Sequence, residues 1–314
     1  MKRKSLISLT AFLVCASVLT ACTETNKKVS FTEYWYKDSG VTTASAETLE
    51  YAVSFKKGNG ITDGYSADYT SGVYTTSLSV TDDGNYLYET SLSIDVTFTY
   101  GRAQTETFTD TVKTSAVFKK DKKLTPISSK REIVGHSPTN APTALASCYS
   151  VVNYTVETKY AGGGGKTTII NNETKTKITP SFTYENDDYT KLDNEQLLLA
   201  LRGISQSATT SSFYVYAPFT GVPQLVDAAF QAKKKGTEFS YTKDGAAFSG
   251  VIDYYPVTLS INDKNSGAAQ TLWIAETNNP MSNDHRNVIL RMEVPVSYSL
   301  GTLVYELKTA NFSK

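Results

Sequence analysis

Cysteine, histidine and net charge are all scarce in this chain of 314 residues. It has three cysteines and two histidines, and its 31 Lys and Arg residues balance its 31 Asp and Glu residues. A chain without a basic excess lacks the electrostatic footprint of proteins that hold nucleic acid by its phosphates. Few histidines and cysteines also leave little material for zinc sites or for activated nucleophiles. We therefore expect no nucleic-acid partner, no metal and no cofactor.

Long apolar runs are scarce too, and the clearest one stands at the amino terminus. It extends from Leu6 to Leu19 and follows three basic residues at positions 2–4. A helix needs about 20 apolar residues to span a bilayer, so this run is too short to do so comfortably. A basic head, a short apolar segment and small residues before a cleavage point are typical of a secretory signal peptide. The sequence predicts such a signal over residues 1–21.

The end of this segment, Leu19-Thr20-Ala21-Cys22, resembles a bacterial lipobox. The resemblance implies cleavage before Cys22, a diacylglyceryl group on its sulfur and acylation of its new amino group. Each buried methylene contributes about 0.8 kcal/mol, so several long acyl chains attach a protein stably where one chain would not. We expect an exported protein anchored to the cell membrane through Cys22 and facing outside the cytoplasm. The alternative is an ordinary cleaved signal in which Cys22 has no role.

The remaining cysteine and the histidines give no catalytic pattern. An exported chain left with Cys148 alone has no disulfide framework, and its Ala-Ser-Cys-Tyr-Ser context favours a buried apolar role. His136 and His285 stand in polar, proline-flanked stretches without metal-ligand neighbours. The Gly-x-Ser-x-Gly elbow of many hydrolases is missing as well. The sequence therefore favours a protein that is not an enzyme.

Tyrosine is abundant, with 21 residues, and together with many Thr and Val residues it favours sheet over helix. Residues 91–100 show the clearest strand pattern, because Leu92, Ile94, Val96 and Phe98 alternate with Ser, Asp and Thr. This period of two places one face on a core and the other in water. Further strands are predicted at 49–57, 72–80, 105–118, 131–134, 151–160, 166–170, 212–217, 239–242, 247–254, 257–261, 270–275, 288–294 and 302–308. Strands of this length are typical of a sheet curled into a barrel.

Two segments have helical features instead. At 193–203, Asp193 is a good N-cap, Gln196 completes a capping-box pattern and Gly203 suits a left-handed C-terminal position. The apolar residues of this segment recur at helical steps along one face, namely Leu197, Leu198, Leu201 and Ile204. A second helix is predicted at 223–235, begun by a proline, closed by Gly236 and ending in three lysines that suit the negative end of its dipole.

The domain organisation follows from these elements. Residues 22–46 begin polar and are predicted to be a tether, whose aromatic residues Phe31, Tyr34, Trp35 and Tyr36 we expect to dock on the domain. Residues 47–314 are predicted to form one curled antiparallel domain. The glycine run at 162–165 is interpreted as a hairpin tip, because it lacks the spacing of a phosphate loop.

Two acidic stretches were considered as calcium sites. Residues 185–188 cluster side-chain oxygens that could hold a weakly bound calcium ion, although a solvated loop is the default interpretation. The stretch beginning at Asp263 starts like a calcium loop but has Ile274 where the closing Glu should stand. A turn is therefore predicted there.

The carboxy-terminal half resembles a known family. The residues that carry the likeness are a helix ending Leu-Arg-Gly at 203, then Leu272-Trp273-Ile274-Ala275, Arg286 to Met292 and Gly301 to Leu307. Their order is similar to an uncharacterised family of exported bacterial proteins that resembles the lipoprotein carrier and receptor superfamily of the bacterial envelope. That resemblance implies a long antiparallel sheet curled into an open barrel with helices on its concave side. It supplies no catalytic residues, and the predicted helix at 223–235 departs from its pattern.

Two functions remain open. In the first, the curled sheet encloses an apolar cavity and the protein binds a lipid or other amphiphile, with Leu197, Leu198, Leu201 and Trp273 as candidate ligand-binding residues. In the second, the chain is a surface module of the envelope that binds glycan or protein through exposed tyrosines. We favour amphiphile binding, since a lipid anchor would place the cavity beside a supply of amphiphiles. The sequence sets no oligomeric state.

Overall fold

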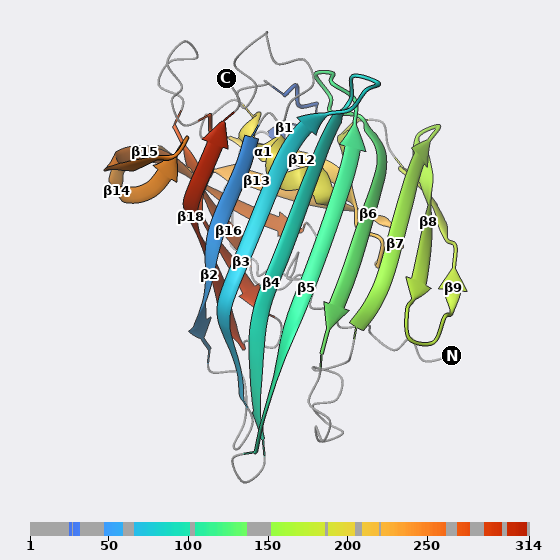
Figure 1. The fold of residues 1–314 in the computed structure, drawn as a ribbon. Helices are drawn as coiled ribbons and strands as arrows, with labels where there is room; N and C mark the ends of the chain where they lie inside the picture. The colour runs from blue at the N-terminus through green and yellow to red at the C-terminus, as the bar shows by residue number, and fades with distance from the viewer. Residues whose placement is uncertain are drawn as a thin grey trace.

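The computed structural model describes most of the chain from residue 25 onwards (Figure 1). The described residues are 25–26, 28–31, 47–58, 66–100, 104–136, 152–185, 188–204, 209–219, 221–261, 269–276, 286–296 and 300–312. They form a mainly β fold, as predicted, with one short helix. No helix in these described ranges is both long enough and apolar enough to cross a membrane. Cys22, Cys148 and His285 lie outside the described residues.

The strands that the sequence predicts are present, several of them longer than predicted, and β1, β9, β10, β11 and β13 are strands that it does not predict. The strands are β1 Thr25–Asn26, β2 Glu47–Lys57, β3 Ser66–Val80, β4 Tyr86–Tyr100, β5 Gln104–Phe118, β6 Pro126–Gly135, β7 Val152–Ala161, β8 Gly164–Asn171, β9 Lys177–Ile178, β10 Ser181–Thr183, β11 Thr190–Asp193, β12 Thr210–Tyr216, β13 Pro223–Phe230, β14 Lys234–Lys243, β15 Ala246–Ile261, β16 Gln270–Ala275, β17 Ile289–Val296 and β18 Gly301–Phe312. The two strands predicted at 247–254 and 257–261 are a single strand, β15.

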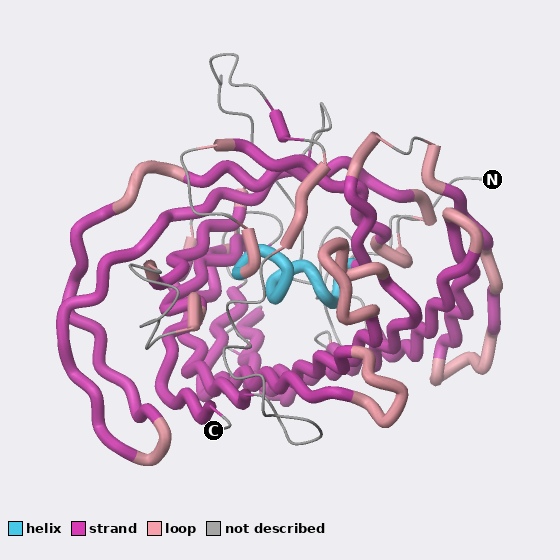
Figure 2. The backbone as a smooth tube through the Cα atoms, turned by 90° about the horizontal axis from the view of Figure 1, so that it is seen from above, coloured by secondary structure: helices cyan, strands magenta, loops and turns pink. Residues whose placement is uncertain are grey.

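Neighbours in the chain are mostly neighbours in the sheet. An antiparallel meander runs from β15 through β16 and β17 to β18, crosses to β2 and continues through β3, β4, β5, β6 and β7 to β8. Strand β12 lies at the other end, paired with β13 on one edge and with β1 and β11 in parallel on the other. Seen from above, the strands curl around the helix (Figure 2). The predicted curled sheet with a helix on its concave side is thus confirmed.

A smaller closed ring of strands adjoins the large curled sheet. Strand β14 pairs with β15 and also, in parallel, with β18, so β14, β15, β16, β17 and β18 close on themselves. The β14–β15 turn holds this closure, because the Asp244 N–H donates to the Ala310 carbonyl (2.9 Å) and the Phe312 N–H donates to Asp244 Oδ1 (2.6 Å). We call these five strands the small ring.

The core lies on the concave side of the sheet. In β4, Leu92, Ile94, Val96 and Phe98 are all buried, while Ser93 is exposed, as the alternating pattern predicted. Burying such a side chain contributes about 1.5–3 kcal/mol, so a one-residue slip of register would be very costly. The face assigned to the core from sequence is therefore confirmed.

The predicted helix at 193–203 is present but shorter and more deeply buried. It consists of a 3-10 turn, Asn194–Gln196, followed by α1, Leu197–Arg202, and all nine residues are buried. Asp193 does cap this segment, accepting from the Glu195 N–H (2.7 Å). The prediction of a capping box is wrong, because the Gln196 side-chain amide donates instead to the Leu124 carbonyl (2.7 Å). Gly203 has φ −91° and is not left-handed.

The prediction of a second helix at 223–235 is wrong. Residues Pro223–Phe230 form strand β13 and Lys234 begins β14. Val226, Ala228 and Phe230 are buried and alternate with less buried neighbours, a period-two pattern that two alanines obscure in the sequence. Strand β13 is paired on both edges, with β12 and β15, and this tertiary pairing overrides the local helix propensity.

The segment after the predicted anchor docks on the domain in the part that is described. Phe31 is buried and stacks on Phe213 with ring centroids 6.0 Å apart, and its N–H donates to the Lys122 carbonyl (2.9 Å). Val29 is buried beside it. The expected docking thus holds for Phe31. Tyr34, Trp35 and Tyr36 lie outside the described residues.

Candidate binding pockets

The four residues predicted to bind a ligand lie in two different surroundings. Leu197, Leu198 and Leu201 belong to the central hydrophobic core. Trp273 lies on the opposite face of its strand, since its neighbours Leu272 and Ile274 point into the core, and it lines an open pocket. The structure therefore does not bring the leucines and the tryptophan together.

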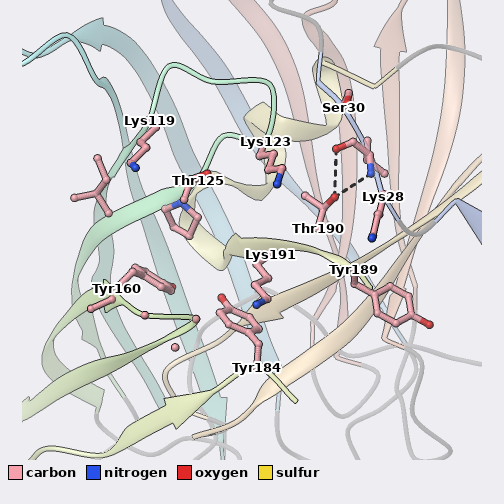
Figure 3. Close-up of a pocket in the computed structure, with 17 residues that line it drawn as sticks. Lys28, Ser30, Lys119, Lys123, Thr125, Tyr160, Tyr184, Tyr189, Thr190 and Lys191 are labelled. Atoms are coloured by element: carbon pink, nitrogen blue, oxygen red, sulfur yellow. Dashed lines mark hydrogen bonds between the residues drawn. The ribbon is translucent and has the colours of Figure 1, made fainter. Parts of the chain in front are cut away.

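One pocket opens where the amino-terminal segment crosses the sheet. It has a volume of about 790 Å³. Its walls come from separate segments of the chain, whose labelled lysines and tyrosines surround one hollow (Figure 3). The lining residues are Lys28, Val29, Ser30, Lys119, Lys123, Thr125, Pro126, Ile127, Tyr160, Ala161, Gly162, Gly163, Gly164, Tyr184, Tyr189, Thr190 and Lys191. We call it the lysine–tyrosine pocket.

The lining of this pocket is basic. It includes Lys28, Lys119, Lys123 and Lys191, and no Asp or Glu is among the described residues that line it. Asp121, in the neighbouring turn, directs its carboxylate to that turn, accepting from the N–H groups of Lys123 (2.9 Å) and Thr125 (3.1 Å). A concave surface lined by charges of one sign concentrates ions of the opposite sign. The pocket is therefore suited to an anionic group.

Aromatic and apolar side chains line the same pocket. Tyr160, Tyr184 and Tyr189 contribute rings, and Val29 and Ile127 contribute aliphatic surface. The Lys191 ammonium lies 5.1 Å from the Tyr184 ring centroid, a cation–π contact that orients both side chains. A ligand that combines an anionic group with an apolar body would find both kinds of surface here.

The glycine run at 162–165 forms one wall of this pocket and is a hairpin tip, as predicted. Gly162 and Gly163 have φ of 57° and 82°, the left-handed conformations that a tight two-residue hairpin turn requires. A glycine is required at position 164 for another reason. A Cβ there would collide with the Phe182 carbonyl oxygen of the neighbouring strand. The Tyr184 N–H donates to the Gly163 carbonyl (3.1 Å) and places Tyr184 at the wall.

The opposite wall is the amino-terminal segment, held to β11 by Thr190. The Val29 N–H donates to Thr190 Oγ1 (2.9 Å), and the Thr190 hydroxyl donates in turn to the Val29 carbonyl (3.2 Å). These residues are 161 positions apart in the chain. Lys28 is thereby held at the rim of a pocket otherwise built from the domain.

A buried polar cluster underlies the pocket, and Tyr160 belongs to both. The Tyr160 and Ser129 hydroxyls donate to Asp193 Oδ2, the latter at 2.6 Å. Burial raises the pKa of Asp193 and of Glu195, whose carboxylate lies 3.4 Å from the Arg131 guanidinium. Burial, with Asp193 nearby, also raises the pKa of Tyr160, which keeps its proton and remains a donor. From the sequence, Asp193 was interpreted only as a helix cap.

Apart from this cluster, His136 and Asp110 form a hydrogen-bonded pair. His136 Nδ1 lies 2.8 Å from Asp110 Oδ1, and the imidazole stacks on Phe108 at 4.8 Å. Burial raises the pKa of Asp110, although its hydrogen bonds to His136 oppose the shift. No group of three or more His, Cys, Asp or Glu side chains arranged to hold a metal occurs among the described residues. Asn186 and Asp187 of the considered calcium cluster lie outside them.

A second pocket, of about 380 Å³, lies in the small ring and contains Trp273. Its lining residues come from all five strands of the ring: Thr237, Glu238, Phe239, Ser240, Tyr254, Trp273, Leu290, Arg291, Glu306, Leu307 and Lys308. We call it the Trp273 pocket. It differs from the lysine–tyrosine pocket in having equal numbers of acidic and basic side chains.

Comparison with known proteins supports the fold. No family model and no curated protein sequence matches the chain. A solved β-barrel-like protein of the domain of unknown function DUF1849, from Brucella abortus, is similar with a TM-score of 0.51 and 9% identity, over 88% of this chain and 100% of that one. A Parabacteroides distasonis structure provisionally named a lipoprotein covers 90% of this chain and 99% of its own at 7% identity. Its TM-score of 0.24 is too low to support an argument. The class that the fold defines is a β-barrel-like protein.

Proposed function

We propose that this protein is an exported lipoprotein, anchored through Cys22, that binds an anionic amphiphile in the lysine–tyrosine pocket. The observation that carries the proposal concerns a cavity of about 790 Å³, whose described lining residues include four lysines and three tyrosines and no carboxylate. Ligand pockets commonly have volumes of about 300–1,000 Å³, so the cavity is large enough for such a molecule. The protein acts by binding and not by catalysis.

The position of Lys28 supports a ligand drawn from the membrane. Lys28 lies six residues after Cys22 in the chain. An extended chain advances at most about 3.3–3.6 Å per residue, so the rim of the pocket stays within roughly 20 Å of a lipid-bearing Cys22. Basic side chains close to a membrane are attracted to anionic headgroups, each by about 1 kcal/mol. The anchor and the pocket thus favour the same ligand.

The lining residues suggest which side chains would contact the headgroup of the ligand and which its apolar body. Lys28, Lys119 and Lys123 are exposed, make no ion pair recorded among the described residues and would hold the anionic headgroup. The tyrosine rings, with Val29 and Ile127, would cover the first part of the apolar body. The core leucines of α1 would remain packed beneath the site.

Titration of the mature protein with short-chain phosphatidylglycerol, followed by calorimetry, tests this proposal. The triple variant Lys28→Gln, Lys119→Gln, Lys123→Gln should bind at least tenfold more weakly. A matched variant, Lys177→Gln, Lys234→Gln, Lys235→Gln, removes as many exposed charges elsewhere and should bind normally. Equal affinity of the two variants, or equal binding of short-chain phosphatidylcholine, would contradict the proposal. Inorganic phosphate alone should bind weakly, because it has no apolar body.

The anchor is tested separately by membrane fractionation. Cys22→Ala should release the protein from the membrane fraction and abolish its labelling by fatty acid, whereas binding of short-chain phosphatidylglycerol should persist. A variant that remains membrane-bound and keeps its fatty-acid label would show that Cys22 is not the anchor.

A further inference from the structure

The Trp273 pocket has a recognisable order of side chains around the small ring. Figure 1 shows β14 and β15 standing away from the barrel wall at one side, with β18 beside them. Because β14 pairs with β15 and with β18, the pocket is bounded by paired strands and not by loops alone. Strands hold side chains in more exact positions than loops do, which favours a specific site.

Successive strands of the ring contribute side chains that contact one another in turn. The Phe239 ring on β14 meets Tyr254 on β15 at 6.2 Å between centroids, and Tyr254 meets Trp273 on β16 at 6.4 Å. The Arg291 guanidinium on β17 lies 5.2 Å from the Trp273 ring centroid. Arg291 Nη1 then donates to Glu306 Oε1 on β18 at 2.7 Å. Along successive strands of the ring, three aromatic side chains are therefore followed by a cation and then by a carboxylate.

The polar end of this row is fixed in direction but remains accessible. Arg291 donates from Nη1 to Glu306 and from Nη2 to Glu293 (2.8 Å), so its planar guanidinium is held in one orientation. The side chains of Arg291 and Glu306 are nevertheless 26% and 44% exposed. Both groups thus retain surface through which a ligand could be hydrogen-bonded.

The charge of the lining argues against an ionic ligand. Glu238 and Glu306 are balanced by Arg291 and Lys308, whereas the described lining of the lysine–tyrosine pocket has four cations and no carboxylate. An anion in this pocket would be repelled by Glu306. A cation would be repelled by Arg291, whose guanidinium lies over the Trp273 ring. A neutral ligand rich in hydroxyl groups avoids both conflicts and uses both polar groups, since guanidinium donates and carboxylate accepts hydrogen bonds.

We propose that the Trp273 pocket binds a sugar ring of a neutral glycan. The apolar face of a pyranose ring would pack on the aromatic row formed by Phe239, Tyr254 and Trp273, and its hydroxyls match the donors of Arg291 and the acceptors of Glu306. A pocket of about 380 Å³ accommodates a sugar unit and leaves the rest of the chain outside. This site is built from residues other than those of the proposed amphiphile site. Either proposal can therefore be wrong without affecting the other.

Tryptophan fluorescence offers a direct measurement, because the chain has only two tryptophans. In the mature protein carrying Trp35→Phe, excitation at a wavelength that tyrosine does not absorb gives emission from Trp273 alone. Chitohexaose, cellohexaose and maltohexaose are the neutral probes, and calorimetry provides a second readout. We expect at least one of them to change the emission saturably, and tetramethylammonium to leave it unchanged.

Variants then locate the binding. Trp273→Ala and Arg291→Lys should each weaken the affinity for the active probe at least tenfold by calorimetry, the second because an ammonium cannot reproduce the planar donor pair. The triple lysine variant of the other pocket serves as the matched control and should bind the probe normally. Arg291→Lys keeps the charge and most of the volume, so it reports on the site even if Trp273→Ala unfolds.

Three outcomes would overturn the proposal. The first is the absence of saturable binding for all three glycans. The second is binding that is unchanged in both Trp273→Ala and Arg291→Lys. The third is a saturable response of Trp273 to tetramethylammonium without a response to any glycan, which would identify a cation site instead.

Discussion

Arg202, the last residue of α1, is a buried charge whose hydrogen-bonding groups are almost entirely matched by protein. Its guanidinium makes a bidentate contact with the Glu47 carboxylate, and it also donates to the carbonyls of Arg286 (2.9 Å) and Asn287 (3.1 Å). The Asn287 amide returns a hydrogen bond to the Arg202 carbonyl (3.0 Å). This single side chain ties the helix to the start of β2 and to the residues that precede β17.

Removing the cation alone should therefore be costly. Arg202→Met leaves the Glu47 carboxylate buried without its partner, and such a loss typically costs about 3–5 kcal/mol. Chemical denaturation would measure it. As a control, Lys56→Met breaks an exposed pair with Glu293 and should cost at most about 1 kcal/mol. The double variant Arg202→Met, Glu47→Leu should be more stable than Arg202→Met. A double variant that is even less stable would show that the charge pair is not what Arg202 contributes.

Glu195 gives a prediction for pH dependence. Burial raises its pKa, so its contribution to stability is fully present below the ordinary value near 4.5 and is lost as pH rises through the raised pKa. Glu195→Gln cannot ionise, so the stability of the wild type relative to this variant should fall as the pH is raised from about 4 towards 7. Each unit by which the pKa is raised corresponds to about 1.4 kcal/mol.

An exposed carboxylate with the opposite shift provides the control. Hydrogen bonding to Lys130 lowers the pKa of Glu132, so any stability that it contributes is lost as the pH falls. Relative to Glu132→Gln, the stability of the wild type should therefore change only below about pH 4.5, where it should fall as the pH is lowered, and should stay nearly constant from there to pH 7. A parallel trend in the two variants would exclude burial as the cause.

At the scale of elements, strand β4 shows how a pattern of alternating residues sets a face. Its inward residues lie in the core, and Thr97 on the other face shares a hydrogen bond with Thr107 (2.9 Å) in an exposed position. Ile94→Asp would bury a carboxylate among apolar side chains and should unfold the domain. Thr97→Asp should change the free energy of unfolding by no more than about 0.5 kcal/mol. Circular dichroism of the two purified variants compares them, and equal effects would contradict the assigned faces.

The β14–β15 turn yields the second prediction at this scale. Asp244 has φ 48°, and its carboxylate accepts from the Phe312 N–H where the small ring closes. Asp244→Ala loses that acceptor and places an alanine in a left-handed conformation, so a loss of about 1–3 kcal/mol is expected. Asp244→Asn tolerates the same conformation, keeps an oxygen acceptor and should cost less. Thermal denaturation distinguishes them, and identical melting temperatures would show that the turn does not hold the ring.

The element that sequence reasoning misassigned is instructive in the same way. Pro223, two adjacent alanines and a lysine-rich end are all compatible with a helix, and the local signals at 223–235 contain nothing against one. The segment is a strand because β12 and β15 offer it hydrogen bonds on both edges and a core for Phe230. Those partners lie outside any local window of sequence.

At the scale of the whole molecule, two pockets of different charge belong to one continuous sheet. The lysine–tyrosine pocket collects residues from positions 28 to 191, and the Trp273 pocket collects residues from 237 to 308. If both proposals hold, a membrane-anchored protein would bind an anionic amphiphile and a neutral glycan at separate sites. The triple lysine variant should then retain glycan binding, and Trp273→Ala should retain short-chain phosphatidylglycerol binding. Calorimetry of each variant with each probe measures this independence, and a loss of both activities in either variant would contradict it.

The sequence by itself determined most of the strands, the position of the helix and the buried face of β4. These features depend on the spacing of apolar residues over a few positions, which burial imposes directly on local sequence. The sequence also groups Trp273 with leucines that lie in the core, whereas Trp273 lines a separate pocket.

Only the tertiary structure decided the closure of the small ring, the strand at Pro223–Phe230 and the meeting of Lys28 with Lys119, Lys123 and Lys191. Each depends on which strand edges pair and in which register, and the partners can lie near opposite ends of the chain, as Glu47 of β2 and Phe312 of β18 do. Local hydrophobic periodicity carries no information about such pairings. They are set by the hydrogen bonds and packing of the whole curled sheet.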